Sequence, residues 1–143
     1  MEEVKLEKEI KDLYDNALKG YKNAYAPYSK FQVGAALLLN NGEIIYGSNV
    51  ENASYGLTNC AERSTLFATY SKGYRKNDIK AFMIIGNTDD VISPCGACRQ
   101  VMSELMMPNT PVYLANLKGK VVKYLNKELL PYTFTEDNLN EGI

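Results

Sequence analysis

Helix-like and strand-like segments alternate along almost the whole chain, and this alternation constrains the fold more than any other feature. Apolar residues recur at helical spacing over 5–24, whereas residues 31–39 alternate between larger apolar and smaller side chains, as strands do. Asn41-Gly42 then predicts a hairpin turn into a second strand over 43–47. The predicted helical face consists of Leu6, Ile10, Leu13, Ala17 and Tyr21.

The rest of the chain continues the alternation. We expect one helix over 60–72 and another from Ser93-Pro94 to about Met106, with Ser93 as N-cap and Pro94 at the first helical position. Together with three further short strands, the pattern predicts an α/β fold, a three-layer α/β/α sandwich around a mixed five-stranded sheet. The length of 143 residues suits a single domain, residues 1–143. The three further strands are expected at 81–86, 112–115 and 121–124.

The chain contains no histidine. Ser-His-Asp and Cys-His catalytic arrangements are therefore excluded, and a metal site has to use Cys, Asp or Glu. The net charge of −1, without a cluster of basic residues, argues against a nucleic-acid partner or a membrane surface. The charged N-terminal segment lacks a secretory apolar region, so we expect a cytoplasmic protein whose cysteines stay reduced.

The three cysteines lie in two short motifs, C-A-E at 60–62 and P-C-G-A-C at 94–98. Cys95 and Cys98 are three residues apart at an expected helix start, so both can face one side of its first turn. Cys60 is expected at the start of another helix, and helix N-termini favour thiolates. Three thiolate ligands leave one tetrahedral position open, which is the pattern of a catalytic zinc. We therefore predict one zinc ion per chain.

Glu62 follows Cys60 by two residues, and both side chains can reach one pocket if Cys60 lies at the helix edge. This spacing fits the zinc-deaminase signature, in which the glutamate carries protons and is not a ligand. Arg63 and Arg99 each directly follow a cysteine motif. They either donate hydrogen bonds to the sulfurs or are ordinary surface arginines. A redox pair at Cys95 and Cys98 would explain neither Cys60 nor Glu62.

A longer pattern includes the two cysteine motifs, C-A-E-R at 60–63 and P-C-G-A-C-R-Q at 94–100. It also includes segments at 25–36, 47–52 and 129–134. This pattern, which covers about residues 21–134, resembles the small homotetrameric zinc-dependent cytidine deaminases. The resemblance implies hydrolysis of cytidine and deoxycytidine to uridine and deoxyuridine with release of ammonia, a reaction of pyrimidine salvage. It also implies that the three cysteines bind zinc and that Glu62 shuttles protons.

The resemblance further implies a nucleoside site that is shared between subunits of a homotetramer. The alternation of a strand independently places Asn49 and Glu51 on the same side of a strand end. The implied roles are ribose binding by Asn49 and Glu51, packing on the pyrimidine by Phe31, a backbone contact to the base by Ala61, and entry into a neighbouring subunit's site by Phe134 and Tyr55.

Two other functions stay open. One is a deaminase of a different cytosine-bearing nucleoside, such as an aminoacyl-nucleoside antibiotic, although Asn49 and Glu51 suit an unmodified ribose. The other is a non-catalytic zinc-binding module in which Glu62 is the fourth ligand. The small acidic chain disfavours a deaminase of polynucleotides.

Overall fold

The computed structural model describes residues 2–3 and 7–142, and its centre is a mixed sheet with the strand order β1-β6-β5-β4-β2-β3. β4 and β5 pair in parallel, and the other neighbours are antiparallel. Five of these strands are the predicted ones, and the two-residue β1 adds to the edge beside β6. The strands are β1 (Glu2–Glu3), β2 (Val33–Leu39), β3 (Ile44–Ser48), β4 (Ile79–Gly86), β5 (Pro111–Asn116) and β6 (Val121–Leu125).

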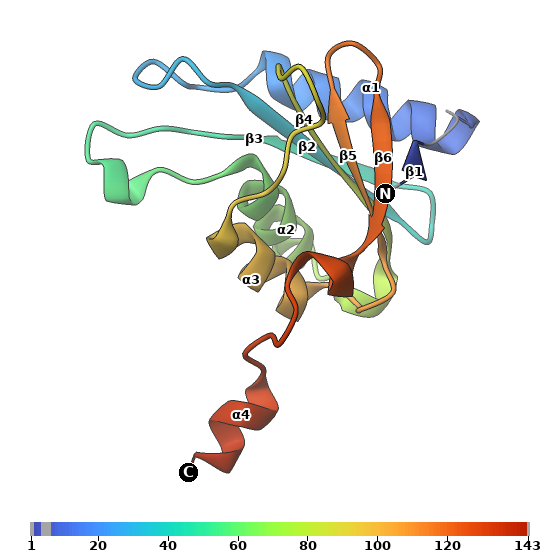
Figure 1. Ribbon diagram of the computed structural model, residues 1–143, viewed down its shortest axis with the longest axis vertical. Helices are drawn as coiled ribbons and strands as arrows, with labels where there is room; N and C mark the ends of the chain where they lie inside the picture. The colour runs from blue at the N-terminus through green and yellow to red at the C-terminus, as the bar shows by residue number, and fades with distance from the viewer. Residues whose placement is uncertain (1, 4–6, 143) are drawn as a thin grey trace.

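Helices cover both faces of the sheet, which confirms the predicted three-layer arrangement (Figure 1). The helix α1 (Lys8–Lys22) packs on one face, and α2 (Ala61–Ser71) and α3 (Gly96–Leu105) pack on the other. A short helix, α4 (Glu136–Glu141), projects away from the sheet and was not predicted (Figure 1). Single 3₁₀ turns are η1 (Tyr55–Leu57), η2 (Lys76–Asp78) and η3 (Asn126–Leu129).

The strand β2, which lies between β4 and the edge strand β3, is buried along its whole length. Successive side chains of a strand point to opposite faces, so Leu37 packs into the core beneath α2 and α3 while Leu38 packs against α1. A strand that is covered on both faces reads as a continuous apolar run, which explains the V-G-A-A-L-L-L sequence. The N-terminal end of this strand, at Val33, opens toward the cysteine motifs.

Helix α1 lies unusually close to the sheet at two glycines. A Cβ atom on Gly34 would lie 2.1 Å from the carbonyl oxygen of Ala17, and one on Gly20 would lie 2.1 Å from that of Gly47. Both distances are far below van der Waals contact, so helix and strand backbones touch directly at these positions. The close approach fixes the layer spacing at the end of β2 that leads to the cavity described below.

Two predicted helices begin elsewhere than the sequence indicated. For the first helix, positions 5–6, including Leu6, lie outside the described residues, and the helix begins at Lys8. The other is the helix predicted from Ser93-Pro94 to about Met106. The prediction that Ser93 is its N-cap was wrong, because α3 begins at Gly96 with Cys95 as N-cap. Ser93 and Pro94 precede the helix, and the Arg99 side chain bonds both of them, as described below. No helix within 7–142 is long and apolar enough to cross a membrane.

Candidate active site

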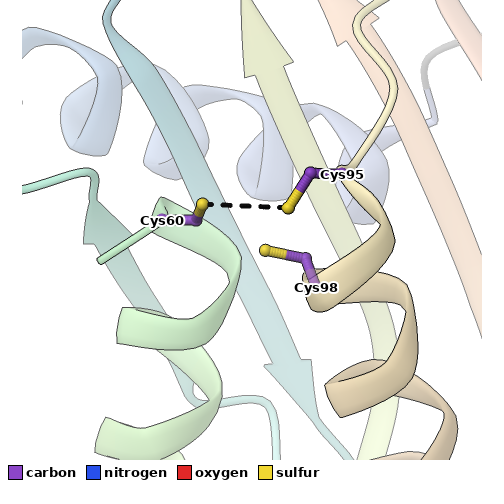
Figure 2. A group of neighbouring side chains, drawn as sticks. All are labelled: Cys60, Cys95 and Cys98. Carbon is purple, nitrogen blue, oxygen red and sulfur yellow. Dashed lines mark hydrogen bonds between the residues drawn. The ribbon is translucent and has the colours of Figure 1, made fainter. Parts of the chain in front are cut away.

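Two helix N-termini present the cysteines to one another. Cys60 is the N-cap of α2 and Cys95 is the N-cap of α3, both with extended backbone, while Cys98 lies in the first turn of α3. Their side chains converge between the two helices (Figure 2). The chain before Cys60 is fixed because Asn59 pairs with Val50 in an isolated antiparallel bridge. The positive ends of two helix dipoles therefore meet where three thiols gather.

The spacing of the three thiols fits a zinc ion. Their Sγ atoms all lie within 4.8 Å of one another, and those of Cys60 and Cys95 are 4.0 Å apart. Zinc–sulfur bonds of about 2.3 Å in a tetrahedral site place sulfurs roughly 3.8 Å apart. The three cysteines are free thiols, and the cluster holds no carboxylate from the described residues. The arrangement therefore offers three ligands and leaves one position for chemistry.

Arg63 and the neighbouring thiols adjust the charge of this cluster. The Arg63 guanidinium donates a hydrogen bond to Cys60 Sγ at 3.3 Å, as one of the two sequence interpretations predicts. A hydrogen bond from the Cys98 thiol and the contact with Arg63 lower the pKa of Cys60 to about 5. The same hydrogen bond, together with burial, raises the pKa of Cys98. Of these two thiols, Cys60 is therefore the one that more readily loses its proton.

Arg99 is partly exposed and has a different set of partners from Arg63. Its Nε atom donates to the carbonyl oxygen of Pro94 at 2.8 Å, and one terminal nitrogen donates to that of Leu129 at 2.7 Å. The other terminal nitrogen donates to the Ser93 hydroxyl. These three acceptors orient the guanidinium toward the segment before Cys95 and the end of η3, so it bonds no sulfur.

Glu62 lies in the first turn of α2 and is only 4% exposed. Burial raises the pKa of its carboxyl group to about 7, and the negative charge of Cys60 adds to this shift. A carboxyl group that titrates near neutrality can both accept and return a proton. Glu62 therefore has the environment of a general acid and base beside the thiols.

A cavity of about 350 Å³ lies beside the cysteine cluster. Its volume is in the range typical of sites for small molecules. Sequence reasoning gave no site role to the other residues that line it, which are Ser29, Val33, Thr58, Ile92 and Ser93. Seven of the sequence-predicted site residues line this cavity: Phe31, Asn49, Glu51, Cys60, Ala61, Glu62 and Cys95.

Asn49 and Glu51 hold the loop that forms one wall of the cavity. Asn49 accepts a hydrogen bond from the backbone N–H of Val33 and donates one to the carbonyl oxygen of Phe31, both at 2.9 Å. Glu51 accepts from the backbone N–H groups of Tyr28 and Ser29, each at 3.0 Å, and from the Ser29 hydroxyl. The hydrogen bonds from Ser29 lower the pKa of Glu51, so this carboxylate stays ionised.

Phe134 and Tyr55 lie outside the cavity of their own chain. Tyr55 is 76% exposed and meets the ring of Tyr28 edge-on, with the ring centroids 6.2 Å apart. Phe134 is 59% exposed and lines a separate hollow near Tyr70 and Arg75. The structure thus leaves Phe134 apart from the site, whereas Tyr55 shares a neighbouring hollow with the cavity residues Ser29, Glu51 and Thr58.

The fold and the site together define a class of enzyme. A mixed sheet with helices on both faces carries Cys-x-Glu at one helix start and Cys-x-x-Cys at another, which is the arrangement of the zinc-dependent deaminases. The family model described as the cytidine and deoxycytidylate deaminase zinc-binding region matches residues 7–114. The chain therefore belongs to this deaminase family, and the cluster of Cys60, Cys95 and Cys98 offers three ligands for its zinc ion.

Individual relatives agree with this assignment. The chain is 51% identical over 129 residues to a cytidine deaminase of Halalkalibacterium halodurans, covering 90% of this chain and 96% of the relative. The crystal structure of a cytidine deaminase from Burkholderia pseudomallei matches with a TM-score of 0.84 and 49% identity, over 87% of this chain and 98% of that one. A blasticidin-S deaminase of Bacillus cereus is 32% identical over 115 residues, covering 76% of this chain and 81% of the relative.

Proposed function

We propose that the chain, as a single domain, deaminates cytidine and deoxycytidine to uridine and deoxyuridine with release of ammonia, and that it serves pyrimidine salvage in the cytoplasm. One observation carries the proposal. The cavity that holds Cys60, Cys95 and Glu62 is also lined by an aromatic ring, an amide and a carboxylate. These are the groups that a flat base and a ribose require.

Glu62 moves the protons in the proposed reaction. When bound by the three cysteines, zinc supplies a water that is activated for attack at neutral pH. Glu62 accepts a proton from the attacking water and donates one to N3 of the pyrimidine ring. It then accepts the proton of the new hydroxyl group at C4 and passes it to the amine at C4, so that the C4–N bond breaks, ammonia leaves and C4 becomes a carbonyl. The pKa of about 7 suits both directions of transfer.

The remaining cavity residues orient the nucleoside. Phe31 packs against the pyrimidine, and the backbone of Ala61 contacts the base. Asn49 and Glu51 bind the ribose hydroxyls. Both side chains can form further hydrogen bonds beyond those that they make to the loop. The Asn49 amide has a second N–H, and the Glu51 carboxylate has further lone pairs. Arg63 withdraws charge from the thiolates that hold the metal.

Substrate choice tests this proposal. We expect comparable kcat/KM for cytidine and deoxycytidine, because Glu51 can hold the 3′-hydroxyl that they share. Free cytosine forfeits the ribose contacts, and deoxycytidylate brings a phosphate toward the ionised Glu51. For both, we expect kcat/KM at least about tenfold lower, the cost of roughly 1.4 kcal/mol of lost binding. The change in ultraviolet absorbance on deamination gives the reaction rate for each of the four substrates.

The same assay separates the alternatives. Comparable efficiency on deoxycytidylate would contradict the proposed role of Glu51. An aminoacyl-nucleoside antibiotic serves as a fifth substrate, and a higher kcat/KM for it than for cytidine would favour the other deaminase function.

We also propose a homotetramer in which Phe134 and Tyr55 complete a neighbouring subunit's site. Their exposure supports this, because a large apolar side chain gains burial by inserting across an interface. Phe134 also lies beyond the last strand and belongs to neither of the two core clusters of the described residues. Stacking of a base on an aromatic ring contributes about 1–3 kcal/mol, so loss of Phe134 should raise KM roughly 5- to 150-fold.

A mixing experiment tests the shared site. Glu62→Gln chains lack the base but still donate Phe134, whereas Phe134→Ala chains keep the base and donate no ring. After co-refolding, hybrid oligomers should contain some sites with both parts, and their activity should exceed the average of the two parents. Each variant refolded alone is the control. Activity no higher than that average, or a monomer in light scattering, would mean that each site is built within one chain.

A further inference from the structure

Arg99 connects two parts of the chain that are far apart in sequence. On one side it bonds Ser93 and Pro94, the two residues that directly precede the ligand Cys95. On the other side it bonds the carbonyl oxygen of Leu129, where the C-terminal segment begins. Because a guanidinium is planar and presents its N–H groups in a fixed fork, satisfying all three acceptors sets their relative positions.

The next residue extends this connection. Gln100 donates from its side-chain amide to the carbonyl oxygen of Phe134 at 3.0 Å. Residues 129–134, the Phe134 segment, are thus attached at both ends by two consecutive side chains of α3. Within the segment, the Thr133 hydroxyl donates to the carbonyl oxygen of Leu130, which closes a turn between the two anchors.

The same helical turn also carries two of the candidate metal ligands. Cys95 caps α3, and Cys98 lies within its first turn, directly before Arg99. A displacement of this turn therefore moves two sulfurs and the anchored segment together. Metal affinity depends on such supporting hydrogen bonds, and their loss typically costs 10- to 100-fold.

We propose that Arg99 is a positioning residue that fixes both the loop before Cys95 for zinc and the Phe134 segment for a neighbouring site. The zinc centre of one chain and the aromatic ring that it offers to another are then parts of one rigid unit. The second half of this inference rests on the proposed function, in which Phe134 enters a neighbouring subunit's site.

Three variants of the zinc-loaded protein separate the two halves. Arg99→Lys keeps the positive charge but loses the fork, Gln100→Ala removes only the anchor at Phe134, and Arg75→Lys is the matched control. Arg75 also donates to backbone carbonyls, those of Tyr70 and Tyr74, which belong to neither the loop before Cys95 nor the Phe134 segment. Zinc release is followed with a chromogenic chelator, and KM and kcat are followed with cytidine.

Arg99→Lys should accelerate zinc release by about 10- to 100-fold and raise KM severalfold. Gln100→Ala should raise KM while its zinc release stays within about twofold of the native rate, and Arg75→Lys should change neither. If Arg99→Lys does not fold, Ser93→Ala removes a single acceptor and should accelerate zinc release by a smaller factor.

If Arg99→Lys releases zinc at the native rate, the claim that Arg99 fixes the loop before Cys95 is overturned. Where Arg99→Lys does not fold, a native release rate in Ser93→Ala overturns it. Suppose that Phe134→Ala raises KM, but Arg99→Lys releases zinc faster and leaves KM unchanged. That result would overturn the claim that Arg99 positions the Phe134 segment. If Phe134→Ala itself leaves KM unchanged, the shared site fails, and zinc release alone still decides whether Arg99 positions Cys95.

Discussion

Replacing Glu62 by glutamine should lower turnover by at least 10²–10⁴-fold while the zinc stays bound. The range is the usual contribution of general acid–base catalysis, and glutamine keeps the size and hydrogen-bonding capacity of the side chain without its ability to take a proton. Zinc should remain because the ligand cluster consists of three sulfurs and no carboxylate from the described residues. The measurements are kcat for cytidine and zinc content by elemental analysis.

Glu43→Gln is a suitable control, because it replaces a carboxylate on the surface that bonds Lys72 and Tyr74. Its turnover should stay near that of the native enzyme. Loss of zinc from Glu62→Gln would identify the carboxylate as a fourth ligand and favour the non-catalytic zinc-binding module. A turnover within tenfold of the native value would remove Glu62 from the proposed mechanism.

Cys98→Ser should abolish both zinc binding and activity. Serine has nearly the same size, but its hydroxyl is a poor zinc ligand at neutral pH, and two thiols remain where three are needed. We expect one zinc per chain in the native protein, little or none in the variant, and turnover below detection. Metal at a thousandfold excess over its dissociation constant stabilises a protein by about 4 kcal/mol. The variant should therefore melt on the order of 10 °C lower than the zinc-loaded enzyme.

The native protein treated with a strong chelator provides the comparison for Cys98→Ser. Its melting temperature should fall to that of the variant, which itself should not respond to chelator. A variant that retains stoichiometric zinc would show that Cys98 is not a ligand. Equal melting temperatures for the native protein with and without chelator would show that the metal does not join α2 to α3.

The fold was predictable where burial leaves a pattern in the sequence. α1 buries one face, on which Leu13 and Ala17 recur at helical spacing, whereas β2 is buried on both faces and reads as an unbroken apolar run. α4 was missed because its sequence, E-D-N-L-N-E, has one apolar residue, Leu139, and that residue is exposed. A helix without a buried face leaves no apolar pattern to detect.

Within the site, the sequence could predict only those residues that lie in recognisable motifs. The cysteine spacing identified a metal cluster because zinc chemistry demands particular atoms at particular distances. The predicted start of α3 was wrong because Ser93-Pro94 has the local sequence of a helix start, whereas in the fold both residues precede the helix and bond the Arg99 side chain. Ser29 was missed as a cavity residue because its contact with Glu51 joins positions 22 residues apart. Nothing in the sequence of either segment indicates that the two side chains meet.

The direct backbone contact between α1 and the sheet has a consequence for comparing sequences. Any side chain at Gly20 or Gly34 would collide with a carbonyl oxygen, so a protein that keeps this layer spacing has to keep glycine there, whatever it deaminates. Identity at these two positions therefore reports architecture and carries no information about substrate. Alignments that are meant to separate nucleoside deaminases by specificity should give them no weight and rely on the cavity wall instead.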